Sequence, residues 1–254
     1  MSIEFNAIRS KSYKEAINQY PNVWDEDMKI MKKYLNPKKG ESIAEIGAGS
    51  GFFSYEISKL IGNKGKLFVV DPSLDQLMPL VKSDLTNLCF SCTTAENFQV
   101  PENHKLDKIW SRGAFHHVNN KVSVMSKLAT SSNINAKLVI FDIFTGSSVA
   151  EFFDYFVSRA CTTGHEVSFL SKEYASSLCH VSGWKEPELI DIPLKWQFNN
   201  KEEIGVFLSI LLSNKPEYSY QNTLNAAEKI LGIKENKNGV ILNWPMTLMV
   251  TERL

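Results

Sequence analysis

The sequence predicts an α/β protein built on a parallel, doubly wound sheet. Apolar, strand-like runs alternate with helical patterns from residue 43 to residue 144, and this alternation requires right-handed crossovers between parallel strands. The run at 67–70 shows no polar alternation, as expected of a strand covered on both faces. The chain has 254 residues, 43% of them hydrophobic, which is enough for one packed domain with an insertion.

Strands and helices can be placed in order along this region. The five strands are expected near residues 43–46, 67–70, 88–92, 108–111 and 138–144. A first helix, at 53–61, has apolar residues on one face. A second begins at Ser73, which together with Gln76 has the S-x-x-Q form of a capping box. A third follows Asn120.

The flanking regions have a different character. Residues 1–40 have apolar side chains at helical spacing, and the second half is rich in aromatic residues. There we expect helices at 152–157, 171–181, 204–212 and 224–231, and strands at 189–198 and 240–251, the last with a bulge or edge at Pro245. The predicted organisation is one domain, 1–254, divided into a helical segment at 1–40, a first half at 41–145, and a second half with a helical insertion at 146–254.

Composition narrows the class of function. The chain has 28 basic and 28 acidic residues, so it lacks the basic excess that nucleic-acid-binding proteins usually show. It has no apolar stretch of membrane-spanning length and no signal-like N-terminus. We therefore expect a cytoplasmic protein that binds neither nucleic acid nor membrane. Cys89 and Cys92 form a C-x-x-C inside a strand; at a period of two they point to opposite faces, which favours buried apolar residues over a metal site.

The most informative segment joins the first strand to the first helix. Residues 43–51 read Ile-Ala-Glu-Ile-Gly-Ala-Gly-Ser-Gly, and a second apolar run ends at Asp71. A glycine-lined turn beside a carboxylate on the neighbouring strand can bind a ligand that carries a ribose and an adenine. Phe52 occupies the position where a dinucleotide fingerprint requires its third glycine, so the spacing argues against a dinucleotide and an NAD-dependent oxidoreductase.

Glu45-x-Gly47-x-Gly49-x-Gly51 with Asp71 resembles the first two motifs of the class I S-adenosylmethionine-dependent methyltransferases. The resemblance implies a Rossmann-like fold with a mostly parallel, seven-stranded sheet and S-adenosyl-L-methionine as the cofactor. It also implies that Glu45 orients the glycine loop or the amino group of the cofactor and that Asp71 accepts hydrogen bonds from the ribose hydroxyls. The complete set of expected cofactor contacts is Tyr13, Glu45, Gly47, Ala48, Gly49, Gly51, Asp71, Pro72, Thr94, Ala95, Glu96, Ser111 and Arg112.

Some of these contacts come from weaker parts of the resemblance. The family often has an acid and then an alanine after the third strand, and here Thr94 stands at the position of the acid. Its hydroxyl can accept a bond from the adenine, or Ala95 and Glu96 can replace it. Ser111 and Arg112 are expected to border the methionine portion of the cofactor. Tyr13 belongs either to the core or to an N-terminal lid like that of the family.

The segment 110–118 resembles the fourth motif of small-molecule methyltransferases, and the Asn/Asp-Pro-Pro-aromatic signature of amino methylation on bases or protein amides is absent. The resemblance therefore implies methyl transfer to a small molecule. His117 and His165 are the candidate general bases, and a structural histidine that holds a turn is the alternative for the pair His116–His117. Two other functions remain open: methylation of RNA or protein, and cofactor binding without methylation.

Overall fold

The structure, a computed structural model, describes residues 7–164 and 166–254. Contacts divide the chain into two compact units. The first, which we call the sheet unit, comprises residues 29–142, 170–190 and 247–254. The second, the aromatic unit, comprises the described residues of 1–28, 143–169 and 191–246. Both units are assembled from segments that are distant in the sequence, so neither corresponds to one continuous part of the chain.

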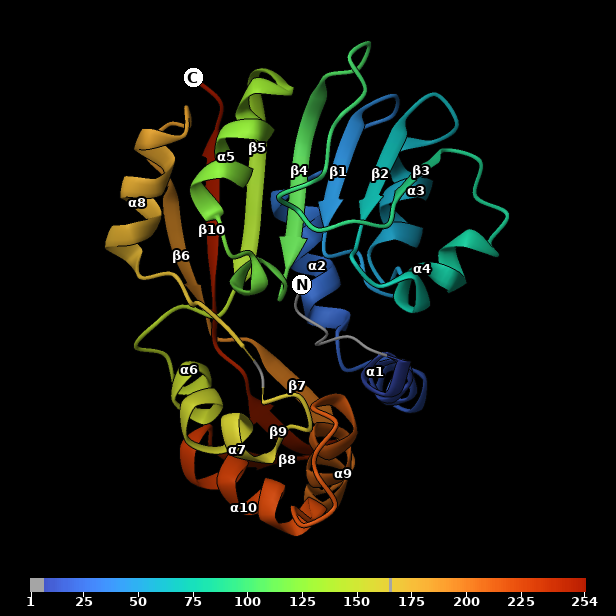
Figure 1. Ribbon diagram of the computed structural model, residues 1–254. Helices are drawn as coiled ribbons and strands as arrows, with labels where there is room; N and C mark the ends of the chain where they lie inside the picture. Colours follow the sequence, from blue (N-terminus) through green and yellow to red (C-terminus); the bar gives the residue numbers. More distant parts are fainter. Residues whose placement is uncertain (1–6, 165) are drawn as a thin grey trace. The chain divides into compact units, whose positions relative to one another are not determined.

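The sheet unit is organised around a seven-stranded sheet with the order β3-β2-β1-β4-β5-β10-β6 (Figure 1). The strands are β1 Ser42–Ile46, β2 Lys66–Val70, β3 Leu88–Ser91, β4 Leu106–Arg112, β5 Ser132–Asp142, β6 Glu188–Ile192 and β10 Met246–Glu252. The first five pair in parallel, and β10 pairs antiparallel with β5. The predicted fold class, a mostly parallel, doubly wound sheet of seven strands, is confirmed.

Helices connect the parallel strands, and the strand order reverses between β1 and β4. The helices of this unit are α3 Ser54–Ile61, α4 Leu74–Val81, α5 Lys121–Thr130 and α8 Lys172–Val181, with a single 3-10 turn, η1 Phe115–His117. The helix α2 Asp25–Tyr34 crosses the boundary between the two units. None of the described helices is long and apolar enough to cross a membrane. In doubly wound sheets, ligands bind beyond the carboxyl ends of the strands where the strand order reverses, which here is between β1 and β4.

The strand ends are followed by polar caps that start the helices. Ser73 accepts a hydrogen bond from the backbone N–H of Gln76 and so begins α4, as predicted. The reciprocal half of the predicted capping box is not formed, because the Gln76 side-chain oxygen is buried without a hydrogen-bond partner in the described part of the chain. Asn120 begins α5 by accepting from the backbone N–H of Ser123.

The aromatic unit contains most of the helices and strands predicted for the second half of the sequence, but two predicted strands are divided and the strand β8 was not predicted. Its elements are α1 Ala7–Gln19, α6 Ser148–Phe152, the π-helical turn η2 Phe153–Val157, α7 Ser158–Ala160, α9 Lys201–Leu211, α10 Tyr220–Ile230, β7 Lys195–Phe198, β8 Ile233–Asn236 and β9 Gly239–Asn243. The predicted strand 189–198 is two strands, β6 and β7, and the predicted strand 240–251 is β9 and β10. Pro193 and Pro245 stand at the two breaks, where proline has no N–H to continue a ladder.

Aromatic side chains form the core of the aromatic unit. The Trp196 and Trp244 rings stack with centroids 4.3 Å apart, and Phe152 packs edge-on against Trp244. The Trp196 indole N–H donates to the buried Asp27 carboxylate at 3.4 Å. In the predicted helix at 152–157, the side chains of Phe152, Phe153 and Phe156 are all buried, so they form part of the core.

The cysteines agree only in part with their interpretation as buried apolar residues. Cys161 and Cys179 are buried, but Cys89 is partly accessible and Cys92 is exposed. The prediction for Cys89 and Cys92 is therefore wrong. Its physical reason is the position of β3 at the edge of the sheet, where one side of the strand has no neighbour to cover it.

We predict that Asn87→Ala lowers the free energy of unfolding by about 1–3 kcal/mol. Asn87 donates to the carbonyls of Ser58 and Gly62 and accepts from the Ser58 hydroxyl, so its loss leaves buried groups at the end of α3 without a partner. Urea titration measures the change. The control is Asn97→Ala, an exposed asparagine for which we expect less than about 0.5 kcal/mol. Equal losses in the two variants would contradict the assigned role.

Candidate functional site

The loop after β1 has bare backbone at Gly47 and Gly51, because no side chain fits at these two positions. Gly47, Gly49 and Gly51 have φ angles of 75°, 55° and 92°, a region that other residues rarely adopt. A Cβ atom on Gly47 would lie 2.2 Å from the Ala114 Cβ, and one on Gly51 would lie 2.5 Å from Leu80 Cδ2. At these two glycines the bare backbone is therefore packed against the loop after β4 and against helix α4.

Asp71 holds this loop in place from the end of β2. One carboxylate oxygen accepts from the Gly49 N–H and the other from the Ser73 N–H, each at 2.9 Å. Burial raises the pKa of Asp71, while the N–H groups of Ser73 and Gly49 and the charge of His117 act to lower it. Each carboxylate oxygen has a second lone pair, so the side chain can hold the loop and still accept from two ligand hydroxyls.

Glu45 is buried beneath the loop, on β1, with 2% of its surface exposed. The hydroxyl of Ser54, the first residue of α3, donates to its carboxylate at 2.5 Å. Burial raises the pKa of Glu45 to about 8, with the nearby Asp71 adding to the rise and the Ser54 hydroxyl opposing it. A positive charge on a ligand would stabilise the ionised form of both carboxyl groups.

The other predicted contacts on β1 and β2 flank these two carboxyl groups. Ala48 is buried, and its backbone N–H donates to the carbonyl of Val70 at 3.0 Å, next to the same bond from Gly47 at 2.8 Å. Pro72 is exposed and directly follows Asp71. The loop after β1 is therefore linked by hydrogen bonds to the end of β2, where the loop that contains Pro72 begins.

Ser111 and Arg112 lie at the end of β4, as predicted. The buried Ser111 hydroxyl donates to the carbonyl of Ile46 at 2.9 Å, which ties the end of β4 to the end of β1. Arg112 is partly accessible. Contact of these residues with the methionine portion of a cofactor stays a prediction.

In the segment after β3, the Glu96 carboxylate accepts hydrogen bonds from neighbouring groups of the protein. Burial acts to raise the pKa of Glu96, but hydrogen bonds from its own N–H, from the N–H groups of Asn120 and Asn119 and from the Thr94 hydroxyl bring the pKa below its ordinary value. Its carboxylate thereby fixes the start of α5, at 2.8 Å from the Asn119 nitrogen. Of the three predicted adenine contacts, Ala95 has no side-chain hydrogen-bonding group; adenine recognition by this segment stays a prediction.

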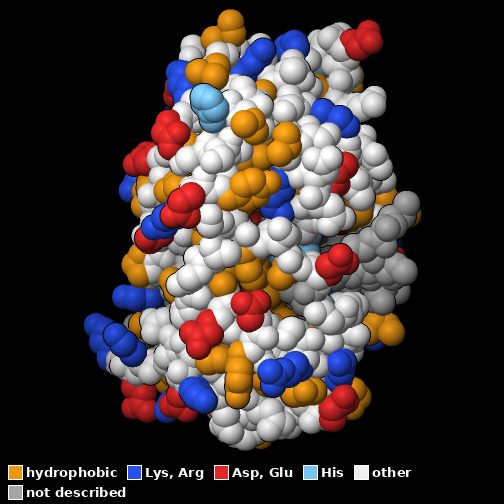
Figure 2. All heavy atoms as spheres, turned by 60° about the vertical axis from the view of Figure 1, so that its left-hand side comes forward, with side chains coloured by type: hydrophobic (Ala, Val, Ile, Leu, Met, Phe, Trp, Pro, Cys, Tyr) orange, Lys and Arg blue, Asp and Glu red, His pale blue; other side chains and the backbone are white. Residues whose placement is uncertain are grey.

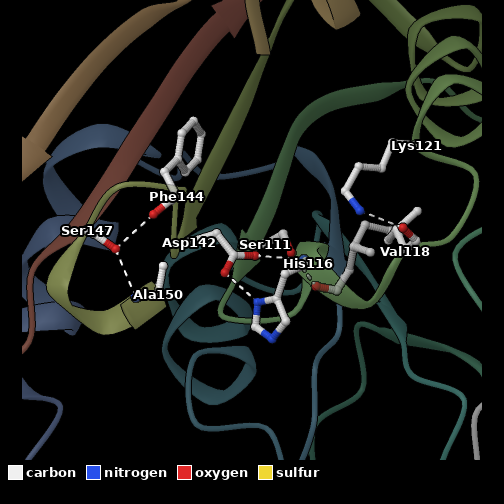
Figure 3. A network of polar contacts seen from close by, with 9 residues as sticks. Ser111, His116, Val118, Lys121, Asp142, Phe144, Ser147 and Ala150 are labelled. Atoms are coloured by element: carbon white, nitrogen blue, oxygen red, sulfur yellow. Dashed lines mark hydrogen bonds and ion pairs between the residues drawn. The ribbon is translucent and has the colours of Figure 1, made fainter. Parts of the chain in front are cut away.

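The turn η1 contains an interaction that the sequence reasoning missed. His116 Nδ1 lies 2.6 Å from Asp142 Oδ1, and the His116 backbone N–H donates to Asp142 Oδ2 at 3.0 Å. Both side chains are only 4% exposed. Figure 3 shows the Asp142 carboxylate turned toward the His116 ring, with the second ring nitrogen on the opposite side. The available signal was a single acid at the end of an otherwise apolar fifth strand.

Lys121 is buried next to this pair, at the start of α5. Its ammonium donates to the carbonyl of Val118 at 2.7 Å and lies over the Phe115 ring. Burial lowers the pKa of Lys121, and the charges of Asp142 and Glu96 oppose that effect. The site therefore contains both acidic and basic side chains that are buried.

The remaining predicted residues lie elsewhere. Tyr13 belongs to the aromatic unit, where its ring packs 5.7 Å from that of Trp24; its contact with a cofactor stays a prediction. His165 lies outside the described residues. His117 is partly accessible, and its ring centroid is 4.1 Å from that of His116.

Comparisons with known proteins show which proteins this chain resembles. Residues 43–133 match the family described as "Methyltransferase domain". The YcgJ protein of Bacillus subtilis has a similar structure, with a TM-score of 0.66 and 16% identity over 90% of this chain and 98% of that chain. No curated protein matches the sequence.

Two further solved structures show how widely the fold is used. Phosphoethanolamine N-methyltransferase 2 of Haemonchus contortus, in complex with S-adenosyl-L-methionine, gives a TM-score of 0.69 at 14% identity; the match covers 96% of this chain and 56% of that longer chain. The [4+2]-cyclase SpnF gives 0.60 at 10% identity and covers 90% of this chain and 80% of that chain.

The sheet order defines a doubly wound protein, in which the glycine loop lies beside the acid that follows β2. The domain that matches residues 43–133 supports the predicted family and enzyme class, a class I S-adenosylmethionine-dependent methyltransferase. The residues fit the cofactor, because a loop with bare backbone at its glycines lies beside two buried carboxyl groups.

We predict that Gly47→Ala weakens binding of S-adenosylhomocysteine tenfold or more, equivalent to about 1.4 kcal/mol. The added Cβ must displace Ala114 and with it the turn η1. The matched control is Gly40→Ala, which has a similar φ of 85° and nothing within 4 Å of the added atom. Both variants lose about 1–2 kcal/mol of stability to the left-handed conformation. Titration calorimetry separates them, and equal affinities would contradict the steric role of Gly47.

A second prediction concerns pH. Because the pKa of Glu45 is raised from 4.5 to about 8, its contribution to stability is fully present below pH 4.5 and is lost as the pH rises through about 8. Glu45→Gln, which cannot ionise, should gain stability relative to the native protein between about pH 5 and 8.5, on the order of 1–3 kcal/mol. Urea titrations across this range test the prediction, with the exposed Glu102→Gln as control. A difference independent of pH would contradict it.

Proposed function

We propose that this protein methylates a small molecule, with S-adenosyl-L-methionine bound across the carboxyl ends of β1 and β2. The observation that carries the proposal is the clamp formed by Asp71 on Gly49 and Ser73 beside the bare backbone of Gly47. A nucleoside needs both elements: close approach to the backbone and acceptors for its hydroxyls.

The residues named above would divide the work of binding. Asp71 would accept from the ribose hydroxyls, and Glu45 would face the positive charge of the cofactor. When bound, the cofactor supplies a methyl group that is activated by an adjacent positive sulfur. The protein then has to hold the acceptor in line, and positioning alone can contribute about 7–11 kcal/mol.

Two observations favour a small acceptor over RNA or protein. The chain has equal numbers of basic and acidic residues, and on the face shown in Figure 2 the two signs are interspersed without a continuous basic area. Binding of a polyanion usually requires such an area. Among the structural neighbours, the Haemonchus contortus enzyme has been captured with phosphomonomethylethanolamine and S-adenosylhomocysteine, which supports amines as the first acceptors to test.

The experiment has two stages. Titration calorimetry with S-adenosylhomocysteine first tests cofactor binding by the native protein, by Asp71→Asn and by Asp75→Asn, a control on an exposed carboxylate. S-adenosyl-L-methionine with a deuterated methyl group is then incubated separately with a panel of amines and hydroxy compounds, with total RNA and with a protein extract. Mass spectrometry detects the transferred label.

We expect binding that Asp71→Asn weakens about tenfold or more and Asp75→Asn does not, and label in a small molecule only. Label in RNA or protein would overturn the proposed acceptor class. Binding without label in any fraction would favour a protein that uses the cofactor without methylation; the [4+2]-cyclase SpnF is a neighbour whose title describes another reaction. Absence of binding would overturn the proposal.

A further inference from the structure

The side chain of Gln76 is buried without a hydrogen bond to its oxygen. Gln76 belongs to the first turn of α4 and is 1% exposed, and its Oε1 has no hydrogen-bond partner among the described residues. The other buried residues in the middle of this helix, Leu77 and Leu80, are apolar. A polar group in such surroundings lowers the stability of a protein unless a partner satisfies it.

Another buried amide of the same unit shows how the fold satisfies such a group. Asn87 accepts from the Ser58 hydroxyl at 2.5 Å and donates to the carbonyls of Ser58 and Gly62 at 2.9 and 3.0 Å. Its oxygen and its nitrogen therefore both have partners inside the protein. The amide of Gln76 is at least as well buried, but its oxygen has no such partner within the described part of the chain. This contrast points to a partner that the protein itself does not supply.

Gln76 faces the loop that is expected to hold the cofactor. Residues 76 and 80 are four apart and therefore lie on the same face of the helix. Leu80 borders the loop after β1, because a Cβ on Gly51 would lie 2.5 Å from its Cδ2. Helical side chains lean toward the N-terminus of their helix, so the amide of Gln76 extends toward Ser73 and Asp71, where α4 begins. The three torsions of a glutamine side chain allow the amide to turn there.

The surroundings determine which chemical group the amide can bind. Asp71 accepts from the N–H of Ser73 at 2.9 Å, and the Ser73 hydroxyl accepts from the N–H of Gln76 at 3.3 Å. These backbone donors are thus already bound, and the nearby carboxylate repels an anion. Since the Gln76 oxygen is an acceptor, its ligand must carry a donor. A hydroxyl both donates and accepts, so it can bind the amide in either of its two orientations.

We propose that Gln76 is a further cofactor-binding residue, whose side-chain amide binds one of the two ribose hydroxyls beside Asp71. The proposal rests on the proposed function. The Gln76 oxygen gains a partner only when the nucleoside binds, so part of the binding free energy comes from relieving an unfavourable burial. The free protein is accordingly less stable than it would be with an apolar side chain at this position, and its affinity for the cofactor is higher.

The first test compares Gln76→Met with the native protein. Methionine has nearly the same length and no amide, so we expect the melting temperature of the free protein to rise by about 2–8 °C. The dissociation constant for S-adenosylhomocysteine, measured by titration calorimetry, should increase about tenfold. A glutamine with only a structural role would give a loss of stability instead. The control is Gln99→Met, on an exposed glutamine of the same unit, which should change neither quantity.

Two results of this test would overturn the proposal while the proposed function stands. If Gln76→Met melts at or below the melting temperature of the native protein, the amide is already satisfied without a ligand. If both proteins bind S-adenosylhomocysteine with equal affinity, the amide does not contact the cofactor. If the native protein does not bind S-adenosylhomocysteine at all, the proposed function fails together with this proposal.

The second test identifies the group that the amide binds. Three analogues of S-adenosylhomocysteine are titrated into the native protein and into Gln76→Met: one without the 2′-hydroxyl, one without the 3′-hydroxyl, and one with inosine in place of adenosine. For one of the two deoxy analogues, we expect the native protein to lose about tenfold more affinity than Gln76→Met does, which is the coupling that a double-mutant cycle measures. Equal losses in the two proteins for both deoxy analogues, or coupling to the inosine analogue instead, would overturn the assignment to a ribose hydroxyl.

Discussion

The contact between Gly47 and Ala114 is the constraint on which the site depends. It leaves no room for a single additional carbon atom, so the loop after β1 and the turn after β4 can only be built together. Asp71 joins the same loop to the end of β2 through Gly49, and Asp142 joins the turn to the end of β5. The loops at the ends of β1, β2, β4 and β5 are thereby held together by direct contacts.

Burial and hydrogen bonding set the pKa values of the ionisable side chains around these loops. Glu45 and Asp71 have raised pKa values and Lys121 a lowered one, in each case first because of burial. Burial thus moves every one of them toward its neutral form. A cationic ligand would reverse the effect on the two carboxyl groups, because an opposite charge nearby favours their ionised form. The site can therefore exchange protons as it fills.

Much of the fold followed from the sequence because its signals are local. The glycines at 47, 49 and 51 and the uninterrupted strands near 67–70 and 108–111 reflect backbone conformation and two-sided burial, which short segments determine by themselves. The break at Pro193 and the strand β8 were missed, and Pro245 was expected to mark a bulge or an edge rather than a break, because a small separate sheet depends on pairing between distant segments.

The site was predictable to the same extent. Asp71 was found because it ends a strand beside the glycine loop, whereas Asp142 was hidden in a predicted strand that ran on to residue 144. Choosing between two adjacent histidines requires knowing which one faces a carboxylate twenty-six residues away. Sequence spacing contains no such information. The pairing of His116 with Asp142 becomes visible only in the structure, where β4 and β5 lie side by side.

The place of β10 in the sheet has a consequence for biosynthesis. β10 lies between β5 and β6, although β6 precedes it in the chain by the whole of β7, α9, α10, β8 and β9. During translation β6 thus emerges before the strand that separates it from β5, and a direct pairing of β5 with β6 competes with the native order. Correct insertion has to wait until residues 246–252 have been synthesised. Such late, long-range pairing is slow, and it makes nascent chains dependent on protection from premature association.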